Sequence, residues 1–342
     1  MALRDAADNL LPAGSRRRAA ARRLLHGAPS PPWQAPAVPP HLLARHRTIR
    51  ADQDAELAAS IRANFFRSDE AYAATNLDQS ELTNDLKARL RGDRTTVIPW
   101  LDSFRSLDGA RVLEIGAGTG ASTVALAEQG ALVTAVDIHA GSLRVADLLC
   151  RQTGLGDLVT FVEANATEMD TRWGRGEFDL IIFFAALEHM TLKERMESLT
   201  KAWAILSEGQ YLVVIETPNR LWWEDDHTSF EPFFHWLPDD LAILYAHRTS
   251  RTIFNEHFSV PGPEALVDLA RWGRGVSFHD FALALDRPAA ELPVRSCLHE
   301  YIGDPRWDSR TSDGQYMRLL RQAAPNVPAG YFFAYLDLAL QR

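Results

Sequence analysis

The chain has 342 residues, 46% of them apolar, and a formal net charge of −9 at pH 7. This length and apolar content support a substantial core and exclude disorder throughout. Residues 1–50 hold nine arginines and two aspartates, a net of +7, so the remaining chain carries −16, and an acidic folded body argues against a nucleic-acid substrate.

Residues 1–50 read as a basic, proline-rich tail, which we expect to be partly disordered. The alternative is a weak attraction of its arginines to an anionic membrane surface. Residues 51–105 show helical spacing of apolar side chains and predict a helical cover.

Residues 111–120 read RVLEIGAGTG, an apolar run followed by three glycines on alternate positions. The run favours a strand buried on both faces, as in a parallel sheet. Gly116, Gly118 and Gly120 can adopt positive φ and let a ligand lie against bare backbone. A dinucleotide fingerprint would place its third glycine one residue later, and here an acid, Glu114, precedes the turn, which argues against NAD.

This block resembles motif I, E/D-x-G-x-G-x-G, of the class I S-adenosylmethionine (SAM)-dependent methyltransferases. The resemblance covers residues 101–239 well and the rest poorly. Thr217, Pro218 and Asn219, followed by a histidine, resemble the small-molecule enzymes of the ubiquinone-biosynthesis type and related enzymes of natural-product and polysaccharide pathways. It implies a Rossmann-like, doubly wound α/β fold with a mostly parallel seven-stranded sheet, an N-terminal helical cover, C-terminal lid insertions and SAM as cofactor. Helices before the first strand would cover the cofactor, which makes Tyr72 a candidate substrate contact.

The next elements predict the rest of the cofactor site. A helix over 122–129 and a strand over 131–136 lead to Asp137, whose carboxylate can accept hydrogen bonds from both ribose hydroxyls; the alternative is that it caps the next helix. A third strand over 158–163 runs into Asn165, where the family usually has an aspartate that accepts from the adenine amino group. An amide oxygen can accept the same bond. The cofactor contacts that we expect are Glu114, Gly116, Ala117, Gly118, Gly120, Asp137, Ile138, Asn165, Ala166 and Ala185.

A fourth buried strand is predicted over 178–184, FDLIIFF, and AALEHM follows at its carboxyl end. The family often shows a similar L-E-H that lines the space near the methyl group. Glu188 and His189 are therefore candidates to touch substrate; the alternative for His189 is that it caps the following helix. That helix ends before Gly209, and a fifth strand is expected over 211–215.

Residues 216–239, ETPNRLWWEDDHTSFEPFFHWLPD, concentrate aromatics, acids and two histidines after the fifth strand. Open α/β sheets bind their ligands at this end of the strands. The aromatic rings can stack on a sugar or aromatic ring, or can form a lid core that closes over SAM and excludes water. The substrate contacts that we expect are Tyr72, Glu188, Asn219, Trp222, Trp223, Phe234 and Trp236.

The C-terminal third carries weaker signals. We expect helices over 239–248 and 263–271, an edge strand over 276–281 and a closing strand over 331–340. The predicted organisation is a tail over 1–50, a helical cover over 51–105 and a SAM-binding domain over 106–342, with lid segments 219–258 and 286–328 over the substrate cleft.

Methyl transfer from a sulfonium needs alignment, and removal of a proton if the acceptor is a hydroxyl. A histidine suits that proton transfer, because its ordinary pKa of about 6.5 is near the operating pH. His227 is the first candidate for the base, and His235 and His189 are the next. The alternative is that His227 orients a substrate oxygen or satisfies loop carbonyls.

The function that we predict is O-methylation of a small molecule, most readily a natural product of secondary metabolism or a sugar. A carbon or nitrogen acceptor is one alternative, and a non-catalytic SAM-binding sensor or partner subunit is another. Asp225, Asp226 and His227 could hold magnesium, but adjacent residues seldom all face one ion, so we expect no metal.

Only two cysteines are present, Cys150 and Cys297, which favours a reducing compartment without disulfides. The sequence shows no signal-peptide pattern and no apolar run long enough to span a membrane. We therefore expect a cytoplasmic protein with a small-molecule substrate, no nucleic-acid partner and no stable membrane insertion. A homodimer stays open.

Overall fold

The computed structural model describes residues 36–65 and 79–342. The first 35 residues of the predicted basic tail, and the candidate substrate contact Tyr72, lie outside the described residues. Within the described ranges, no helix combines the length and apolar character needed to cross a membrane.

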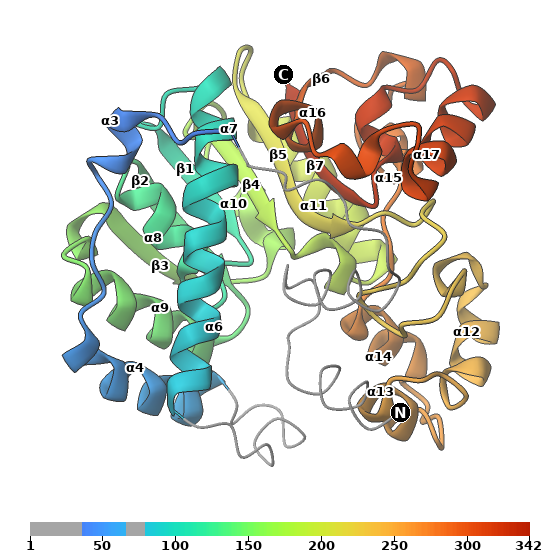
Figure 1. Cartoon of the computed structure of the whole chain (residues 1–342), viewed down its shortest axis with the longest axis horizontal. Coiled ribbons are helices and arrows are strands. Elements are labelled where there is room, and N and C mark those ends of the chain that lie inside the picture. The colour runs from blue at the N-terminus through green and yellow to red at the C-terminus, as the bar shows by residue number, and fades with distance from the viewer. Residues whose placement is uncertain (1–35, 66–78) are drawn as a thin grey trace.

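A seven-stranded sheet with the order β3-β2-β1-β4-β5-β7-β6 forms the centre of the molecule (Figure 1). The first five strands in this order are parallel to one another, and β7 runs antiparallel to both β5 and β6. The strands are β1 (Arg111–Ile115), β2 (Leu132–Asp137), β3 (Val159–Glu163), β4 (Leu180–Phe184), β5 (Tyr211–Pro218), β6 (Val294–Cys297) and β7 (Tyr335–Gln341). The predicted Rossmann-like, mostly parallel seven-stranded sheet is confirmed.

Helices cover both faces of this sheet, because successive side chains of a strand point to opposite faces. In β4, Ile182 belongs to one core cluster and Ile181 to the other. The helices from the start of the chain to β5 are α3 (Pro40–Leu43), α4 (Asp54–Ser60), α6 (Gln79–Gly92), α7 (Ile98–Phe104), α8 (Ala121–Ala127), α9 (Ala140–Gln152), α10 (Met169–Arg172) and α11 (Leu192–Ile205). Those after β5 are α12 (Asp239–Ala246), α13 (Thr252–His257), α14 (Ala265–Trp272), α15 (Phe278–Ala284), α16 (Leu298–Ile302) and α17 (Ser312–Ala323).

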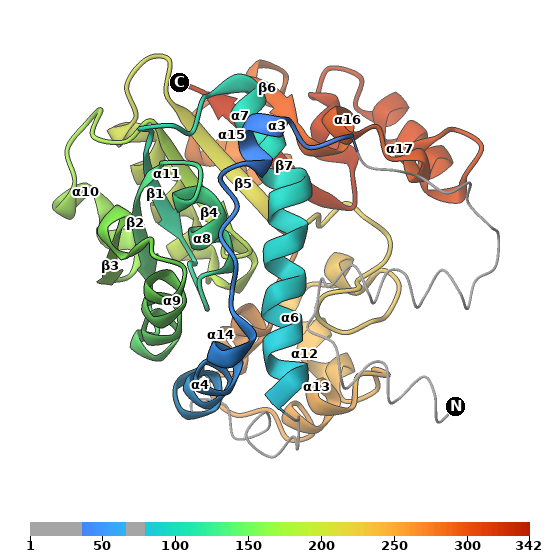
Figure 2. The ribbon, with the colours of Figure 1, turned by 60° about the vertical axis from the view of Figure 1, so that its left-hand side comes forward.

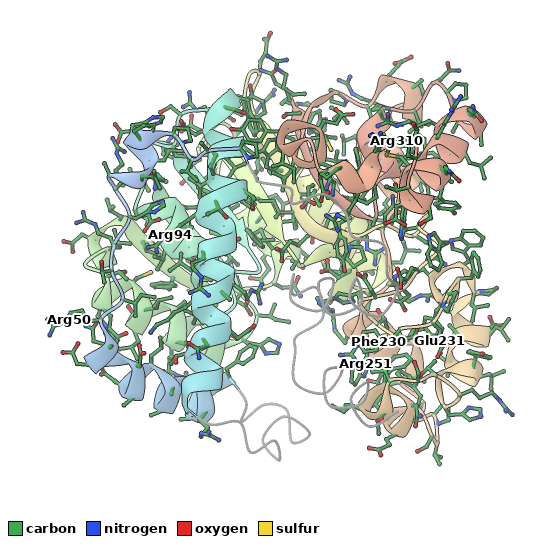
Figure 3. The ribbon with its side chains drawn as sticks, viewed as in Figure 1. Arg50, Arg94, Phe230, Glu231, Arg251 and Arg310 are labelled. Atoms are coloured by element: carbon green, nitrogen blue, oxygen red, sulfur yellow. The ribbon has the colours of Figure 1, made fainter. Side chains whose placement is uncertain are left out.

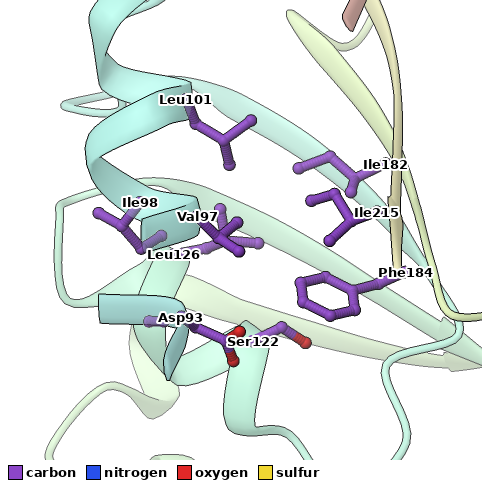
Figure 4. A pocket seen from close by; sticks show the side chains of 10 residues that line it. Asp93, Val97, Ile98, Leu101, Ser122, Leu126, Ile182, Phe184 and Ile215 are labelled. Atoms are coloured by element: carbon purple, nitrogen blue, oxygen red, sulfur yellow. The ribbon is translucent and has the colours of Figure 1, made fainter. Parts of the chain in front are cut away.

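The helices before β1 are fixed to the sheet rather than lying loosely over it (Figure 2). Arg94 pairs with the buried Glu128 at 2.6 Å, which ties the π-helical turn η4 (Asp93–Val97) to the end of α8. Leu101 of α7 lies with Phe184 of β4 in the pocket of Figure 4, whose lining is apolar apart from two side chains. This pocket is therefore part of the core. The described part of the predicted helical cover packs firmly against the sheet.

A separate helical unit follows β5 and lies beside the carboxyl ends of the parallel strands. It contains α12, α13 and α14, close to the predicted helical ranges, and it has a small core of its own (Figure 1). Phe234, Phe254 and Phe258 are at most 1% exposed in this core. The unit therefore has enough buried surface to hold a fixed shape next to the sheet.

The structure corrects two expectations about the C-terminal third. The edge strand predicted over 276–281 is wrong, because Ser277 begins helix α15 with a capping box in which its N–H donates to Asp280 at 2.9 Å. The segment 286–328, predicted as a lid, instead supplies the edge strand β6, and Gln341 of β7 donates to the Pro293 carbonyl at 3.0 Å. At least its first part belongs to the sheet.

Candidate functional site

The glycine turn after β1 has the conformation that its sequence predicts. Gly116, Gly118 and Gly120 have φ of +84°, +53° and +87°. A Cβ at Gly116 would lie 2.8 Å from the Cβ of Ala186, and one at Gly120 would lie 2.7 Å from the Cα of Ala146, so both glycines are required for packing. Nothing approaches the same position of Gly118 within 3.9 Å. The turn is therefore closed on two sides and open at Gly118, which fits a ligand lying on the backbone there.

Glu114 supports the turn from inside the protein. Its side chain is fully buried, and it accepts hydrogen bonds from the hydroxyls of Ser122 and, at 2.6 Å, Thr123 in the first turn of α8. Burial raises the pKa of this carboxyl. Contrary to our expectation of a direct cofactor contact, Glu114 is 0% exposed and its carboxylate binds α8.

Asp137, at the tip of β2, is tied to the glycine turn. One carboxylate oxygen accepts the N–H of Gly118 at 2.9 Å, and the other accepts the N–H of His139 at 2.8 Å. Helix α9 has His139 as its N-cap and no side-chain cap, so Asp137 does not take the helix-capping role. A carboxylate has about four acceptor positions, so two stay open for ribose hydroxyls. The neighbouring Ile138 is 49% exposed, as a residue beside a ligand site can be.

Asn165 is oriented differently from our expectation. Its amide oxygen accepts the backbone N–H and the hydroxyl of Thr167, at 3.0 and 2.9 Å, and so caps the short helix η6 (Ala166–Glu168). Both lone pairs of that oxygen are used, so it is not free to accept from an adenine amino group. The amide NH₂ is the group left for the cofactor.

Glu188 lies in the short helix η7 (Leu187–His189), directly after the carboxyl end of β4. Its side chain is fully buried, and Oε2 accepts a hydrogen bond from the Thr217 hydroxyl of β5 at 3.3 Å. Oε1 is buried and has no hydrogen-bond partner. Burial raises the pKa of this carboxyl to about 8, although Arg195 and the Thr217 bond favour its charged form.

Two of the three candidate histidines converge on this carboxylate. Nε2 of His189 and Nε2 of His227 each lie 3.9 Å from Glu188 Oε1, and the ring centroids of the two histidines are 5.1 Å apart. One histidine comes from the end of β4 and the other from the loop after β5. The structure therefore assembles one polar cluster, Glu188, His189 and His227, from two neighbouring strand ends.

The position of the His227 ring depends on two residues that sequence reasoning did not single out. Nδ1 of His227 lies 3.1 Å from the Thr228 hydroxyl, which itself donates to the Gly273 carbonyl at 2.6 Å. A Cβ at Gly273 would lie 2.5 Å from Cε1 of His227. Burial lowers the pKa of His227 well below its usual range, so its ring is neutral. The only sequence signal for Gly273 was its place just after a predicted helix.

The loop that carries His227 is organised by Asp225. This buried carboxylate accepts the N–H groups of His227, Thr228 and Ser229 at 3.1, 2.7 and 2.8 Å. Burial opposes the charge, but the His235 ring and these N–H groups hold the pKa of Asp225 well below its usual range. Asp225 therefore binds the backbone of the loop and the ring of His235.

His235 is not available as a base. Its Nε2 lies 3.2 Å from Asp225, and its Nδ1 accepts the N–H of Gly275 at 3.3 Å. With both ring nitrogens engaged and the side chain 2% exposed, His235 fixes the loop. Arg251 adds to this by donating to the carbonyls of His227 and Thr228 at 2.8 Å, with its guanidinium 4.7 Å from the Phe230 ring (Figure 3).

Three of the seven expected substrate contacts pack inside the protein. Trp222 is 4% exposed and packs edge-on against Trp307 and Tyr316, at 5.5 and 5.1 Å between ring centroids. Phe234 lies in the core of the α12–α14 unit. Asn219 is buried and donates to the carbonyls of Tyr331 and Phe333, both at 2.7 Å. These three side chains are therefore corrected from substrate contacts to packing residues.

Among the expected aromatic contacts in the described part of the chain, Trp223 and Trp236 keep accessible surface. Trp236 is 49% exposed, and its ring centroid lies 4.7 Å from that of Phe233. Trp223 is partly buried, at 6.4 Å from the same Phe233 ring. Both lie on the loop that carries His227, so they remain candidates to contact a substrate ring.

An acid at the tip of β2 and a glycine turn after β1 define a nucleotide-cofactor site on a doubly wound sheet. Residues 112–209 match the family model described as a methyltransferase domain. Over these residues the chain is similar to the class I SAM-dependent methyltransferases, a class whose cofactor is SAM.

The curated relatives are similar over part of their length. The chain is 36% identical over 124 residues to the ubiquinone biosynthesis O-methyltransferase of Paracidovorax citrulli, which covers 35% of this chain and 49% of the relative. It is 46% identical over 59 residues to the cypemycin N-terminal methyltransferase of a Streptomyces species, or 17% of this chain and 24% of the relative. The chain thus spans about half the length, or less, of these relatives.

A solved structure of magnesium protoporphyrin IX methyltransferase from Synechocystis PCC 6803, with bound SAM, is 20% identical to this chain. The alignment covers 51% of this chain and 80% of that one, with a TM-score of 0.36.

Proposed function

We propose that this protein transfers a methyl group from SAM to a hydroxyl of a small molecule, a natural product or a sugar. The curated relative with the longer match is named as an O-methyltransferase, which supports an oxygen acceptor. The observation that carries the proposal is the cluster of Glu188, His189 and His227, because a hydroxyl must lose its proton as the methyl group arrives.

The cluster begins close to the cofactor turn. Gly116 approaches Ala186 so closely that an added Cβ would lie 2.8 Å from the Cβ of Ala186. Ala186 is two residues before Glu188, and two peptide units reach no further than about 7.6 Å. A methyl donor held at the glycine turn would therefore be within a short distance of the cluster.

In this proposal, the cofactor lies over Gly118 and Asp137 and receives the amide NH₂ of Asn165. The acceptor enters on the side of Trp223 and Trp236, and His227 activates its hydroxyl. The Nε2 lone pair of His227 can act on that hydroxyl directly, by taking its proton, or through a cation that it helps to hold; the second role is argued below.

The proposal is tested with labelled SAM and a panel of acceptors matched in size, bearing phenolic hydroxyls, sugar hydroxyls or amines. Label transfer to a hydroxyl acceptor by the wild-type chain is the expected result. His227→Ala should lower kcat by about 10² to 10⁴ while leaving SAM affinity nearly unchanged, because the residue acts on the acceptor. His247→Ala, a histidine outside the cluster on the surface after α12, is the matched control.

Two alternatives correspond to other outcomes. Transfer to amines alone would favour a nitrogen acceptor, which the name of the Streptomyces relative makes worth testing. Binding of SAM without turnover on every acceptor would favour a non-catalytic SAM-binding protein.

A further inference from the structure

Three acceptor atoms face one another in the cluster of Glu188, His189 and His227. Glu188 Oε1 lies 3.9 Å from each of the two Nε2 atoms. One atom from each residue can be chosen so that all three lie within 4.8 Å of one another. The distances are too long for hydrogen bonds between these atoms.

Hydrogen bonds on the far side of each ring decide where its proton lies. Nδ1 of His189 lies 2.8 Å from the Arg271 carbonyl, which can only accept, so this nitrogen carries the proton. Nδ1 of His227 lies against the Thr228 hydroxyl, whose own proton goes to the Gly273 carbonyl. Both Nε2 atoms therefore present lone pairs to Glu188.

An arrangement of three acceptors without a donor is unfavourable in a protein interior. Glu188 Oε1 is buried and has no partner, and buried polar atoms are normally satisfied. A proton on Glu188 would satisfy at most one of the two imidazoles. A positive ion at the centre would satisfy all three acceptors at once.

We propose that Glu188, His189 and His227 bind one divalent transition-metal ion, of which Zn²⁺ is the type. Two imidazole nitrogens and one carboxylate oxygen suit Zn²⁺, Co²⁺ or Fe²⁺, whereas Mg²⁺ prefers a shell of oxygens. In a tetrahedral site with bonds of about 2.0–2.1 Å, ligand atoms are about 3.3 Å apart. The observed spacing requires each side chain to move inward by less than about 1 Å.

The surroundings resemble the outer shell of a metal site. A ligating histidine usually donates its other ring nitrogen to a carbonyl or similar acceptor, and both histidines do so here. Two of the nearby cations are paired with acids: Arg195 lies 3.1 Å from Asp280, and Arg271 lies 2.7 Å from Glu194. Their repulsion of a bound ion is reduced accordingly.

The metal ligands differ from those considered in the sequence. Asp225 is used by backbone N–H groups and His235, and Asp226 accepts the Tyr335 hydroxyl at 2.7 Å. Only His227 is common to both sets.

Three protein ligands leave a coordination position open. If the proposed methyl transfer holds, the acceptor hydroxyl takes that position, and the metal lowers the pKa of the hydroxyl so that an oxygen nucleophile forms near neutral pH. The proton then leaves to solvent, and the methyl group moves from the sulfonium to the oxygen. In the loaded protein His227 serves as a ligand rather than as the base.

The test uses the full chain, treated with chelator, dialysed and titrated with Co²⁺, whose visible absorption reports a protein-bound ion. We expect one Co²⁺ per chain, displaced by Zn²⁺. His189→Ala is the main variant, since this side chain is 42% exposed and its loss should not unfold the protein. Loss of a residue that hydrogen-bonds a metal ligand typically weakens metal binding by about 10- to 100-fold. Thr228→Val removes such a partner of His227 and should weaken Co²⁺ binding by about that factor. His189→Ala removes a ligand itself and should weaken Co²⁺ binding by at least as much.

His257→Ala is the matched control, because His257 lies 3.7 Å from Asp268 as a surface histidine and acid pair. It should leave Co²⁺ binding unchanged. No Co²⁺ spectrum in the wild type, or equal binding in wild type and His189→Ala, would overturn the metal site. Metal binding that follows these variants, together with no methyl transfer to any acceptor, would leave the metal site standing and reject the O-methylation proposal.

Discussion

Asp137 accepts the backbone N–H of Gly118 at 2.9 Å, so the tip of β2 holds the turn that follows β1. One carboxylate thereby fixes the open position of the glycine turn and faces the expected ribose. Asp137→Ala should lower SAM affinity by on the order of tenfold or more, because a charge-assisted hydrogen bond contributes about 1.5–3 kcal/mol. Calorimetry measures this, with Asp147→Ala, an acid paired with Arg151 on α9, as control. Equal affinities in both variants would remove Asp137 from the site.

Gly118 provides a second test of where the cofactor lies. Gly118→Leu should abolish SAM binding, because the space beside its Cα is free of protein atoms and the side chain would occupy it. Gly154→Leu is the control, since Gly154 also has positive φ, +72°, and nothing within 4 Å. Both variants should lose similar stability in thermal melting. If the Gly118 variant bound SAM as the Gly154 variant does, the turn would not be the cofactor site.

Gly273 should matter for turnover although we expect it to touch no substrate. Gly273→Ala would displace the His227 ring, since the new Cβ lies 2.5 Å from Cε1, and a misplacement of about 1 Å can cost about 10²-fold in rate. We expect kcat to fall with SAM affinity unchanged. Gly303→Ala also places a Cβ at positive φ, +60°, in the less strained αL region and without a neighbour within 4 Å, and should keep its kcat. A normal kcat in Gly273→Ala would show that the position of His227 does not limit turnover.

Glu194 links α11 to α14 and gives a pH-dependent contribution to stability. The hydrogen bond from Arg271 is the main reason that the pKa of Glu194 is lowered to about 2. A lowered folded pKa stabilises the fold above the unfolded pKa of about 4.3, and this stabilisation is lost as pH falls toward 2. Glu194→Gln should therefore cost about 1 kcal/mol or less at pH 7, since the pair is partly exposed, and progressively less from pH 5 to 3.

Thermal melting of the two proteins across that range measures the effect. Glu197→Gln, a partly exposed acid on the same helix whose partner Lys193, at 3.9 Å, is largely exposed, is the control and should show little difference. A gap between wild type and Glu194→Gln that grows toward acid would contradict the assignment.

The segment 219–258 should become more protected from hydrogen exchange when SAM and acceptor bind, since it carries His227 and the exposed Trp236. Strand β6 should change little, because it is paired with β7 in the sheet. A rise of equal size in β6 would restore the sequence-based view that 286–328 forms one cover.

The sequence predicted the elements whose residues are uniformly buried. In β4 all five residues are buried, and such an apolar run allows only a covered strand. The prediction of an edge strand over 276–281 was wrong because apolar side chains alternate there over a short window. The competing signal, for a helix, was the capping box of Ser277 and Asp280. Strand β6 was missed because two of its four residues are Arg295 and Ser296.

The cofactor side of the site was partly predictable, since its residues follow directly on strand ends. The cluster was not, because His227 lies 38 residues after His189 and its orientation is set by Thr228 and Gly273. Among the three histidines, only their partners distinguish the free lone pairs of His189 and His227 from the engaged ring of His235.

Asn219 joins the two ends of the long excursion between β5 and β7. Its N–H donates to the Ala334 carbonyl at 2.9 Å, and its side chain binds the carbonyls of Tyr331 and Phe333. The end of β5 and the start of β7 are therefore joined at one point, while β6, within the excursion, returns to the edge of the sheet. A related sequence could replace the part of the excursion between this junction and β6 and keep β1 and β2, whose ends carry the predicted cofactor contacts.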